Sequence, residues 1–269
     1  MPQFNNALEV LRLLQKTNCR DCGEKTCMAF AGQVYLGKRQ LIQCPHLAPE
    51  VVMSSASQQV KANVQEENFL RSIAAMKNTL RTLDLAKRAE SIGASYDGAY
   101  LTLPMMGKPF RVNRNGEVFT DLHVNQWVLG TALSYIIGCK GVPLSANWVP
   151  LRELPSGRDW YRLFGQQCEV ILKKTADAYA DLFEDLVHIF AGRQVDERFD
   201  SDIAVILSPF PLVPILICYW RPEEGMDSSL NLFFDDTAES NLGIEAVYSL
   251  GVGIATMLEK LARLHGNVG

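Results

Sequence analysis

Four cysteines near the N-terminus have the spacing of metal ligands. They follow the pattern Cys19-x2-Cys22-x4-Cys27-x16-Cys44-Pro45, so three thiols fall within nine residues and the fourth returns from further along the chain. A cubane iron–sulfur cluster needs four thiolates that converge from different directions. The sequence therefore predicts that Cys19, Cys22, Cys27 and Cys44 bind one iron–sulfur cluster, of the [4Fe–4S] type.

Two other chemistries also use closely spaced cysteines. Structural zinc sites have two Cys-x2-Cys pairs, or a cysteine pair with a histidine pair, whereas this segment has one such pair and its nearest histidine is His46. A redox-active Cys-x2-Cys disulfide would leave Cys27 and Cys44 without a role. The spacing favours the cluster over both alternatives.

The other three cysteines, Cys139, Cys168 and Cys218, lie in apolar stretches without paired spacing, and we expect them to be small buried core residues. The start of the chain has no basic segment followed by a long apolar run, which a secretory signal would show. No stretch reaches the roughly 20 apolar residues that a membrane span needs. We expect a cytoplasmic protein without a membrane segment, in which thiols stay reduced and available to metal.

The elements around the four cysteines must bring them together. Apolar residues recur at helical spacing over residues 6–15 and 26–35, and Gly37 is expected to end the second helix. Gly23 allows a tight turn between the helices. We predict a helix–loop–helix–loop module over residues 1–48, which is too small to hold a core unaided and which a bound cluster would stabilise.

The remainder of the chain predicts a helical linker and a larger domain. Residues 49–92 are polar with apolar residues at helical intervals, which indicates one or two connecting helices. Residues 93–269 alternate strand and helix patterns. The predicted strands are 96–104, 108–112, 117–120, 146–152, 203–207, 213–220 and 229–234, and the predicted helices are 124–137, 156–165, 169–190 and 243–264. The predicted fold class is α+β: a small helical iron–sulfur module followed by an antiparallel-sheet domain with packed helices.

The cysteine segment resembles a known module. The resemblance rests on Leu14-x2-Thr17-Asn18-Cys19-x2-Cys22-Gly23-x2-Thr26-Cys27-x2-Phe30-Ala31-x5-Gly37-x6-Cys44-Pro45. This stretch is similar to the four-cysteine [4Fe–4S] module family, found in the large subunit of the corrinoid iron–sulfur protein of acetyl-CoA metabolism and in the B subunit of the Rnf-type electron-transport complex. The resemblance implies that the four cysteines are cluster ligands. It associates the module with reductive reactivation of a corrinoid in the first protein and with an electron path in the second.

The rest of the chain departs from both of those proteins. It is too short for the two larger domains of the corrinoid subunit, and the membrane segment of the Rnf-type subunit is absent. It resembles instead an uncharacterised domain family that follows this module in proteins of anaerobes, a likeness that implies no activity. The segments behind this likeness are Trp148-x3-Arg152-x2-Pro155-Ser156-Gly157 and Pro209-x-Pro211-x2-Pro214-x5-Trp220.

Charge is distributed unevenly along the chain. The net charge is −4, but residues 1–48 have six basic and three acidic side chains and a net charge of +3, which leaves −7 for the rest. The acidic total argues against nucleic acid as the main partner. The basic side chains either offset the negative charge of a thiolate-ligated cluster or form an ordinary solvated face, and both interpretations stay open.

Charged residues near the ends of two neighbouring strands are the first candidate site of the larger domain. Arg221, Glu223 and Glu224 follow one strand, while Asp235 and Asp236 follow the next. Carboxylates gathered there could bind a cation or transfer protons. Solvated strand ends are the more ordinary interpretation, and we favour it.

Aromatic and histidine residues give weaker signals. Trp127, Trp148 and Trp160 could line a flat cofactor pocket, although such residues more often anchor a core. His123 and His188 are isolated, and we expect His188 to be a structural histidine on an apolar helix. The pair Gly251-x-Gly253 opens no strand–turn–helix unit and so predicts no phosphate loop.

Two functions fit these observations. The first is an iron–sulfur redox protein whose cluster passes single electrons to a partner protein or to a cofactor held by the larger domain; by the resemblance, a corrinoid protein is a candidate acceptor. The alternative is a non-catalytic binding or scaffolding protein whose cluster is structural or senses oxygen. An enzyme active in the larger domain ranks last, because the sequence offers no nucleophile–base set. Neither nucleic acid nor a membrane is expected as a partner.

Overall fold

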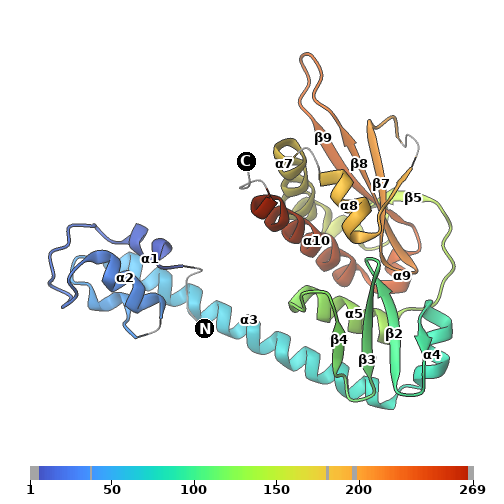
Figure 1. Ribbon diagram of the computed structural model, residues 1–269, viewed down its shortest axis with the longest axis horizontal. Coiled ribbons are helices and arrows are strands. Elements are labelled where there is room, and N and C mark those ends of the chain that lie inside the picture. The colour runs from blue at the N-terminus through green and yellow to red at the C-terminus, as the bar shows by residue number, and fades with distance from the viewer. Residues whose placement is uncertain (1–5, 37, 180–181, 196–198, 266–269) are drawn as a thin grey trace. The chain divides into compact units, whose positions relative to one another are not determined.

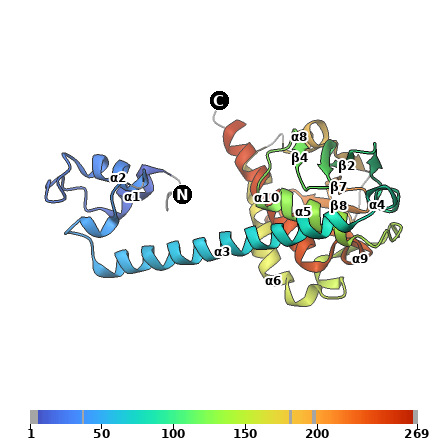
Figure 2. The same ribbon diagram turned by 90° about the horizontal axis from the view of Figure 1, so that it is seen from below.

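The computed structural model describes residues 6–36, 38–179, 182–195 and 199–265, with the backbone alone for residues 49, 50, 52–65 and 265 (Figure 1, Figure 2). The chain divides into two compact units, Met1–Arg71 and Ser72–Gly269. The division falls inside the polar segment 49–92. Each unit is described by itself.

The N-terminal unit contains two short helices around a small core. They are α1 (Ala7–Leu13) and α2 (Cys27–Tyr35), followed by a single 3-10 turn at Leu41–Gln43. Side chains at the helix starts accept backbone N–H groups, Asn6 from Glu9 and Thr26 from Ala29, both at 3.0 Å. The core consists of Val10, Leu14, Phe30, Ala31, Val34 and Leu41. Both predicted helices are confirmed, whereas the predicted stop at Gly37 lies outside the described residues.

The polar segment forms the long helix α3 (Pro49–Thr82) and the shorter α4 (Leu85–Ile92). The Asp84 side chain accepts a hydrogen bond from the Lys87 backbone N–H (3.2 Å), which starts α4. Gly93, with φ of 72°, ends it in the left-handed conformation. Ile73 and Leu80, near the C-terminal end of α3, are buried in the second unit.

The first sheet of the second unit has four antiparallel strands in the order β1-β2-β3-β4. Leu101, Leu103 and Met105 are fully buried and alternate with more exposed residues along β2, as expected for a strand with one face in the core. The predicted hairpin through Met106-Gly107 is confirmed, with Leu103 opposite Phe110. The strands are β1 (Ser95–Tyr96), β2 (Tyr100–Met105), β3 (Lys108–Asn113) and β4 (Val118–Thr120).

The second sheet has five antiparallel strands in the order β5-β9-β8-β7-β6. Its central strand β8 is buried from Val213 to Tyr219, which explains the continuous apolar run in the sequence. The two sheets meet where the Met106 N–H donates to the Ser208 carbonyl (3.2 Å). The strands are β5 (Trp148–Pro150), β6 (Arg193–Val195), β7 (Ile203–Phe210), β8 (Val213–Trp220) and β9 (Ser229–Asp235).

Besides α4, which contacts β1 and β2, six α-helices lie in the described part of the second unit. They are α5 (Gln126–Gly138), α6 (Tyr161–Phe164), α7 (Val170–Ala178), α8 (Leu182–Phe190), α9 (Ala238–Leu242) and α10 (Ile244–His265). Helix α10, red in Figure 1, packs beside α5 and α7, and α8 lies against β7. The predicted α+β class, with short N-terminal helices before antiparallel sheets and packed helices, is confirmed.

The prediction of one continuous helix over 169–190 is wrong. Helix α7 ends at Ala178, and Tyr179 is extended with φ of −128° and ψ of 99°. The Tyr179 hydroxyl donates to the Asp185 carboxylate in α8 (2.8 Å), which links the two helices across the break. The predicted strand 96–104 is divided in the structure, where β1 ends at Tyr96 and β2 begins at Tyr100. The short elements β6 and α9 are absent from the prediction, because their few residues have no distinctive period.

The Gly251-x-Gly253 pair serves helix packing. A Cβ atom on Gly253 would lie 2.3 Å from the Trp127 ring, and one on Gly251 would lie 2.5 Å from the Phe164 ring. Both glycines lie within α10, so their missing side chains let two aromatic rings approach the helix backbone. This agrees with the prediction that the pair forms no phosphate loop.

Candidate metal centre

The structure brings the four predicted cysteine ligands to one cavity of the N-terminal unit. Cys19 and Cys22 lie on the loop between α1 and α2, Cys27 is the first residue of α2, and Cys44 follows the 3-10 turn. Cys19 is exposed and the other three are half-buried. Four cysteines from three separate segments therefore line one cavity, as the ligands of a four-thiolate cluster must.

The loop before α2 has an unusual backbone. Lys16, Asn18 and Arg20 have φ values of 61°, 53° and 72°, and Gly23 has φ of 82°. Left-handed conformations are uncommon outside glycine and asparagine, and each costs of order 1 kcal/mol or more. Alternating left-handed residues can turn successive backbone N–H groups toward a common point, which suits an anion. Gly23 makes the tight turn that was predicted for it, with its N–H donating to the Arg20 carbonyl at 2.8 Å.

Hydrogen bonds around Cys27 fit a thiolate ligand. The Asn18 backbone N–H donates to the Cys27 Sγ (3.4 Å), and the Cys27 backbone N–H donates to the Asn18 Oδ1 (2.8 Å). Because Cys27 begins α2, its sulfur also lies at the positive end of the helix dipole, where a negatively charged group is stabilised. The donor set and its surroundings therefore fit an anionic iron–sulfur cluster.

Arg39 ties the segment before Cys44 to the cysteine loop. Its guanidinium is 3.5 Å from the Glu24 carboxylate and donates to the Cys22 carbonyl at 3.5 Å. The Cβ position of Gly23 is 3.7 Å from the same guanidinium. One arginine thus packs along the turn and places positive charge beside Cys22.

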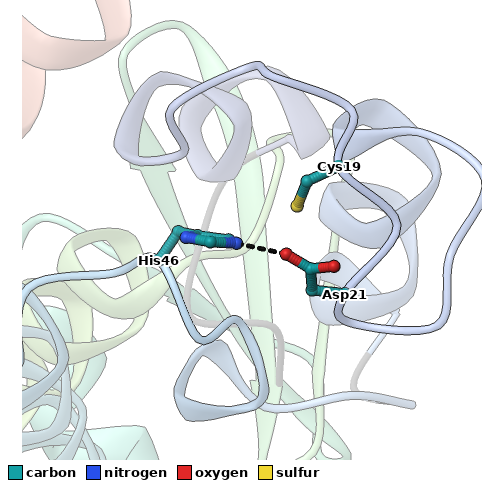
Figure 3. A group of neighbouring side chains, drawn as sticks. All are labelled: Cys19, Asp21 and His46. Atoms are coloured by element: carbon teal, nitrogen blue, oxygen red, sulfur yellow. Dashed lines mark hydrogen bonds and ion pairs between the residues drawn. The ribbon is translucent and has the colours of Figure 1, made fainter.

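Cys19, Asp21 and His46 form a second set of possible ligands (Figure 3). One ligand atom from each lies within 4.8 Å of the others, and the His46 Nε2 is 2.5 Å from the Asp21 Oδ2. Hydrogen bonds from His46 and Cys19 hold the pKa of Asp21 below its usual value. Such a set can hold a divalent ion, but it would leave Cys22, Cys27 and Cys44 unused, so the donor chemistry favours the four-thiolate site.

The candidate carboxylate site of the larger domain is not formed. Glu223 and Glu224 lie exposed in the turn between β8 and β9, whereas Asp235 lies at the opposite end of β9. Asp235 is buried, and its carboxylate accepts hydrogen bonds from Ser145, Ala146 and Thr237. The two strands are neighbours as expected, but Glu223 and Glu224 precede the start of β9 and Asp235 lies at its end, so the predicted cluster of carboxylates does not form.

The tryptophans contact different parts of the fold and do not form one pocket. Trp127 packs on α10, Trp148 packs on the second sheet, and the Trp160 ring is 5.1 Å from that of Tyr248. His123 is exposed. His188 is also exposed, on α8, so burial does not support the structural role expected for it. Cys139, Cys168 and Cys218 are buried as predicted, and burial raises the pKa of the Cys168 and Cys218 thiols.

Two known families match this chain, one in its N-terminal part and the other in its larger domain. Residues 84–257, more than half of the chain, match the family described as a domain of unknown function (DUF3786), and the chain belongs to this family. Residues 14–46, which include all four cysteines, match the family described as "Putative Fe-S cluster". The expectation of an uncharacterised domain family after an iron–sulfur module is confirmed.

Curated relatives resemble a limited part of the chain. The gamma 2 subunit of the acetyl-CoA decarbonylase/synthase complex of Methanosarcina thermophila is 31% identical over 97 residues, covering 34% of this chain and 17% of the relative. The gamma subunit from Methanocaldococcus jannaschii is 43% identical over 47 residues, or 18% and 10%. The corrinoid/iron-sulfur protein large subunit of Moorella thermoacetica is 44% identical over 41 residues, or 15% and 9%. The chain thus matches less than a fifth of the length of each relative.

No solved structure matches this chain. Among the helices that the structure describes, none combines the length and the apolar character needed to cross a membrane.

Proposed function

We propose that this chain is an iron–sulfur redox protein in which Cys19, Cys22, Cys27 and Cys44 hold a [4Fe–4S] cluster. The observation that carries the proposal is that these four cysteines line one cavity together with Asn18 and Arg20, two left-handed residues of the loop before α2. When bound, such a cluster supplies reversible one-electron chemistry. The proposed limits are residues 1–48 for the module, 49–92 for a helical linker and 93–269 for the family domain, in a cytoplasmic protein.

The chain's own residues would set how readily the site accepts an electron. The Asn18 N–H bond to the Cys27 sulfur and the nearby Arg39 both stabilise added negative charge, so each would raise the reduction potential. Cys19 is the exposed ligand and offers the shortest route to a partner. Electron exchange would therefore take place at the face of the module that carries Cys19.

Charge around that face favours an acidic partner. The acids Asp21 and Glu24 are paired internally, with His46 and Arg39. Lys16, Arg20 and Lys25 are exposed. Positive potential of this kind speeds encounter with a negatively charged partner and makes the rate sensitive to salt. The similarity to a corrinoid/iron-sulfur protein makes a corrinoid protein one candidate partner.

Anaerobic purification with iron and sulfide analysis tests the cluster. We expect iron and acid-labile sulfide in equal amounts, at the four-per-chain ratio of the [4Fe–4S] formula, and a visible absorption that bleaches on reduction with a low-potential reductant. Cys27→Ser should lose most of the iron, whereas Cys139→Ala, at a buried cysteine of the other unit, should keep it. A chain that retains zinc in place of iron, or a cluster that cannot be reduced, would refute the redox role.

A structural or oxygen-sensing cluster is the second candidate function. It is favoured by the small core of the module, six buried residues, which is little for a unit of this size. Under this alternative, reduction of the cluster leaves partner binding unchanged. Removal of the cluster unfolds the module and abolishes partner binding. Comparing partner binding by the oxidised, reduced and iron-free protein separates the two functions.

A further inference from the structure

The second unit contains an open cleft that plays no part in the proposed redox site. Its volume is about 740 Å³, which lies within the usual range of small-molecule sites, roughly 300–1,000 Å³. The walls come from α7, α8, the start of β7 and the β8–β9 hairpin, elements that belong to the family domain. Segments far apart in the sequence therefore build it.

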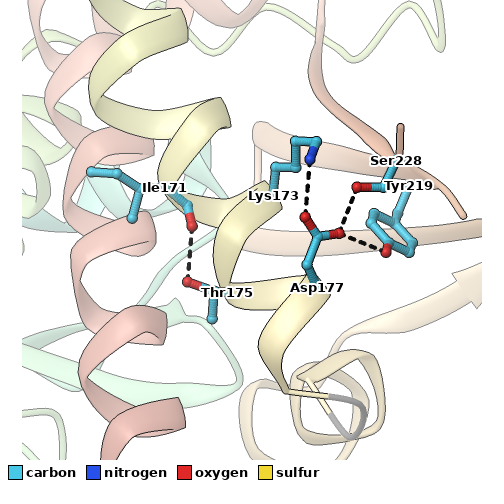
Figure 4. Close-up of polar contacts among 6 residues, drawn as sticks. All are labelled: Ile171, Lys173, Thr175, Asp177, Tyr219 and Ser228. Carbon is cyan, nitrogen blue, oxygen red and sulfur yellow. Dashed lines mark hydrogen bonds and ion pairs between the residues drawn. The ribbon is translucent and has the colours of Figure 1, made fainter. Parts of the chain in front are cut away.

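Asp177 is the polar centre of this cleft (Figure 4). Its Oδ1 accepts hydrogen bonds from the Tyr219 hydroxyl (2.9 Å) and the Ser228 hydroxyl (2.6 Å), and its Oδ2 accepts one from the Lys173 ammonium (2.9 Å). Tyr219 and Ser228 are only 6% and 7% exposed. Burial opposes ionisation of Asp177, but the bonds from Ser228, Lys173 and Tyr219 outweigh it and lower the pKa. The carboxylate is therefore charged at neutral pH, and the three donors are fixed in place.

This arrangement leaves specific groups available to a ligand. The Lys173 ammonium donates one of its three N–H groups to Asp177 and keeps two. The Tyr219 and Ser228 hydroxyls donate to Asp177, so their oxygens keep lone pairs that can accept. Because Asp177 neutralises the charge of Lys173, this pair can orient a ligand through hydrogen bonds but adds no net charge to the cleft.

Arg221 supplies positive charge at the rim. Its backbone N–H donates to the Asp202 carboxylate (2.7 Å), which fixes the start of the turn, while its side chain is exposed and lines the cleft. No ion pair joins its guanidinium to any carboxylate in the described part of the chain. Asp227 also lines the rim and is, with Asp177, one of the two acidic residues of the lining. A ligand with one anionic group suits this balance better than a dense polyanion.

An apolar wall completes the site. The Phe183 ring packs 5.3 Å from the Tyr219 ring, and Ile203 lies on the same lining. Small-molecule sites combine such apolar surface with a few placed polar groups. An apolar ligand body could rest on Phe183 and Ile203 while its charged end reaches Arg221.

We propose that this cleft binds a small organic anion with an apolar body, held at its anionic end by Arg221 and by the free N–H donors of Lys173. A carboxylate and a phosphate ester share the required chemistry, and the guanidinium can contact either with two N–H groups. The proposal does not depend on the cluster. It assigns a ligand-binding role to the family domain.

Ligand-observed NMR on the anaerobic full-length protein tests the proposal with benzoate, phenyl phosphate and benzyl alcohol. These probes share an aromatic ring and differ in charge. We expect saturable binding of at least one anion and binding of the neutral alcohol at least about tenfold weaker, since the alcohol cannot make the charge-assisted contact. Whether benzoate or phenyl phosphate binds more tightly identifies the anionic group.

Two variants locate the binding. Arg221→Gln and Lys173→Gln should each weaken binding of the anionic probe about tenfold or more, and neither side chain is buried. Arg158→Gln, at an exposed arginine of the 3-10 turn Gly157–Asp159, is the matched control and should bind normally. Absence of saturable binding by either anion, equal binding of benzyl alcohol, or unchanged affinity in both variants would overturn the proposal.

Discussion

The Glu169 carboxylate completes the hydrogen bonding of a strand edge. Its Oε1 accepts a hydrogen bond from the Leu232 backbone N–H in β9 (3.1 Å). Strand β5 pairs with β9 only from Phe233 to Asp235, so Leu232 lies just beyond the end of its neighbour. Glu169 occupies a π-helical turn, Gly165–Glu169, that directs the side chain to this edge. The Glu169 carboxylate thus accepts the hydrogen bond that a neighbouring strand would otherwise accept, and its side chain is half-buried there.

Glu169→Gln should remove a pH dependence of stability. Burial raises the pKa of Glu169, against smaller opposing effects of Leu232 and Arg152. The unfolded chain therefore loses this proton at lower pH than the folded chain, so the free energy of unfolding falls as pH rises from the usual glutamate pKa to the raised one. Glutamine keeps the acceptor without the charge. Denaturant unfolding from pH 5 to 8, followed by tryptophan fluorescence, should show a smaller slope in the variant.

The matched control for this titration is Glu224→Gln, which removes an exposed carboxylate from the β8–β9 turn. It should preserve the slope of the native protein. An identical slope in Glu169→Gln and the native chain would contradict the assignment.

Asp235→Asn should lower stability by about 1–3 kcal/mol, the usual cost of leaving buried polar groups without a good partner. Burial disfavours the charge, but bonds from Thr237, Ser145 and Ala146 together lower the pKa of Asp235. The stabilisation is therefore fully present above the ordinary aspartate pKa and is lost as pH falls through the lowered one. Urea unfolding at pH 7 measures the loss. If the variant were as stable as Glu224→Gln, the network would have no net energetic role.

Gly253→Ala should destabilise the second unit by about 1–3 kcal/mol, as overpacking commonly does. Its Cβ would lie 2.3 Å from the Trp127 ring, which must move. Gly138, in the last turn of α5, has open space at the Cβ position. Gly138→Ala should therefore be neutral or stabilising by up to about 1 kcal/mol. Thermal unfolding of the two variants checks the pair, and the reverse order would be inconsistent with close packing at α10.

Asn18 should control how long the proposed cluster survives. Its side chain accepts the Cys27 N–H, and its φ of 53° suits asparagine or glycine. Asn18→Ala loses both advantages, whereas Asn18→Gly loses only the side chain. Loss of visible absorbance in the presence of an iron chelator should be fastest for alanine, intermediate for glycine and slowest for the native protein. Equal rates in all three would remove Asn18 from the site.

Local patterns in the sequence predicted those parts of the fold that depend on neighbours along the chain. Helix α2 follows from its apolar residues at helical spacing, and Cys19, Cys22 and Cys27 line the same cavity because they lie within nine residues of one another. Strand β8 was recognised from its apolar run, and its bounds agree with the prediction. In these cases, the information lies within a few residues.

Contacts between distant segments could not be predicted in this way. Asp21 meets His46 across 25 residues, and Asp177 meets Tyr219 and Ser228 across 42 and 51. Nothing in the local pattern around Asp177 says which hairpin will pack against α7. The burial of Asp235 escaped prediction for the same reason, because its partners Ser145 and Ala146 come from a distant loop.

The position of Cys27 at the start of α2 has a consequence for the life of the protein. The same residue that would hold iron also begins the helix that contributes Phe30, Ala31 and Val34 to the core of the module. Since Cys27 is a proposed ligand, loss of the cluster would also destabilise the start of α2 and the hydrogen bonds between Cys27 and Asn18. Loss of iron would then expose the loop to proteases. We therefore expect proteases to degrade the iron-free chain faster than the iron-bound chain.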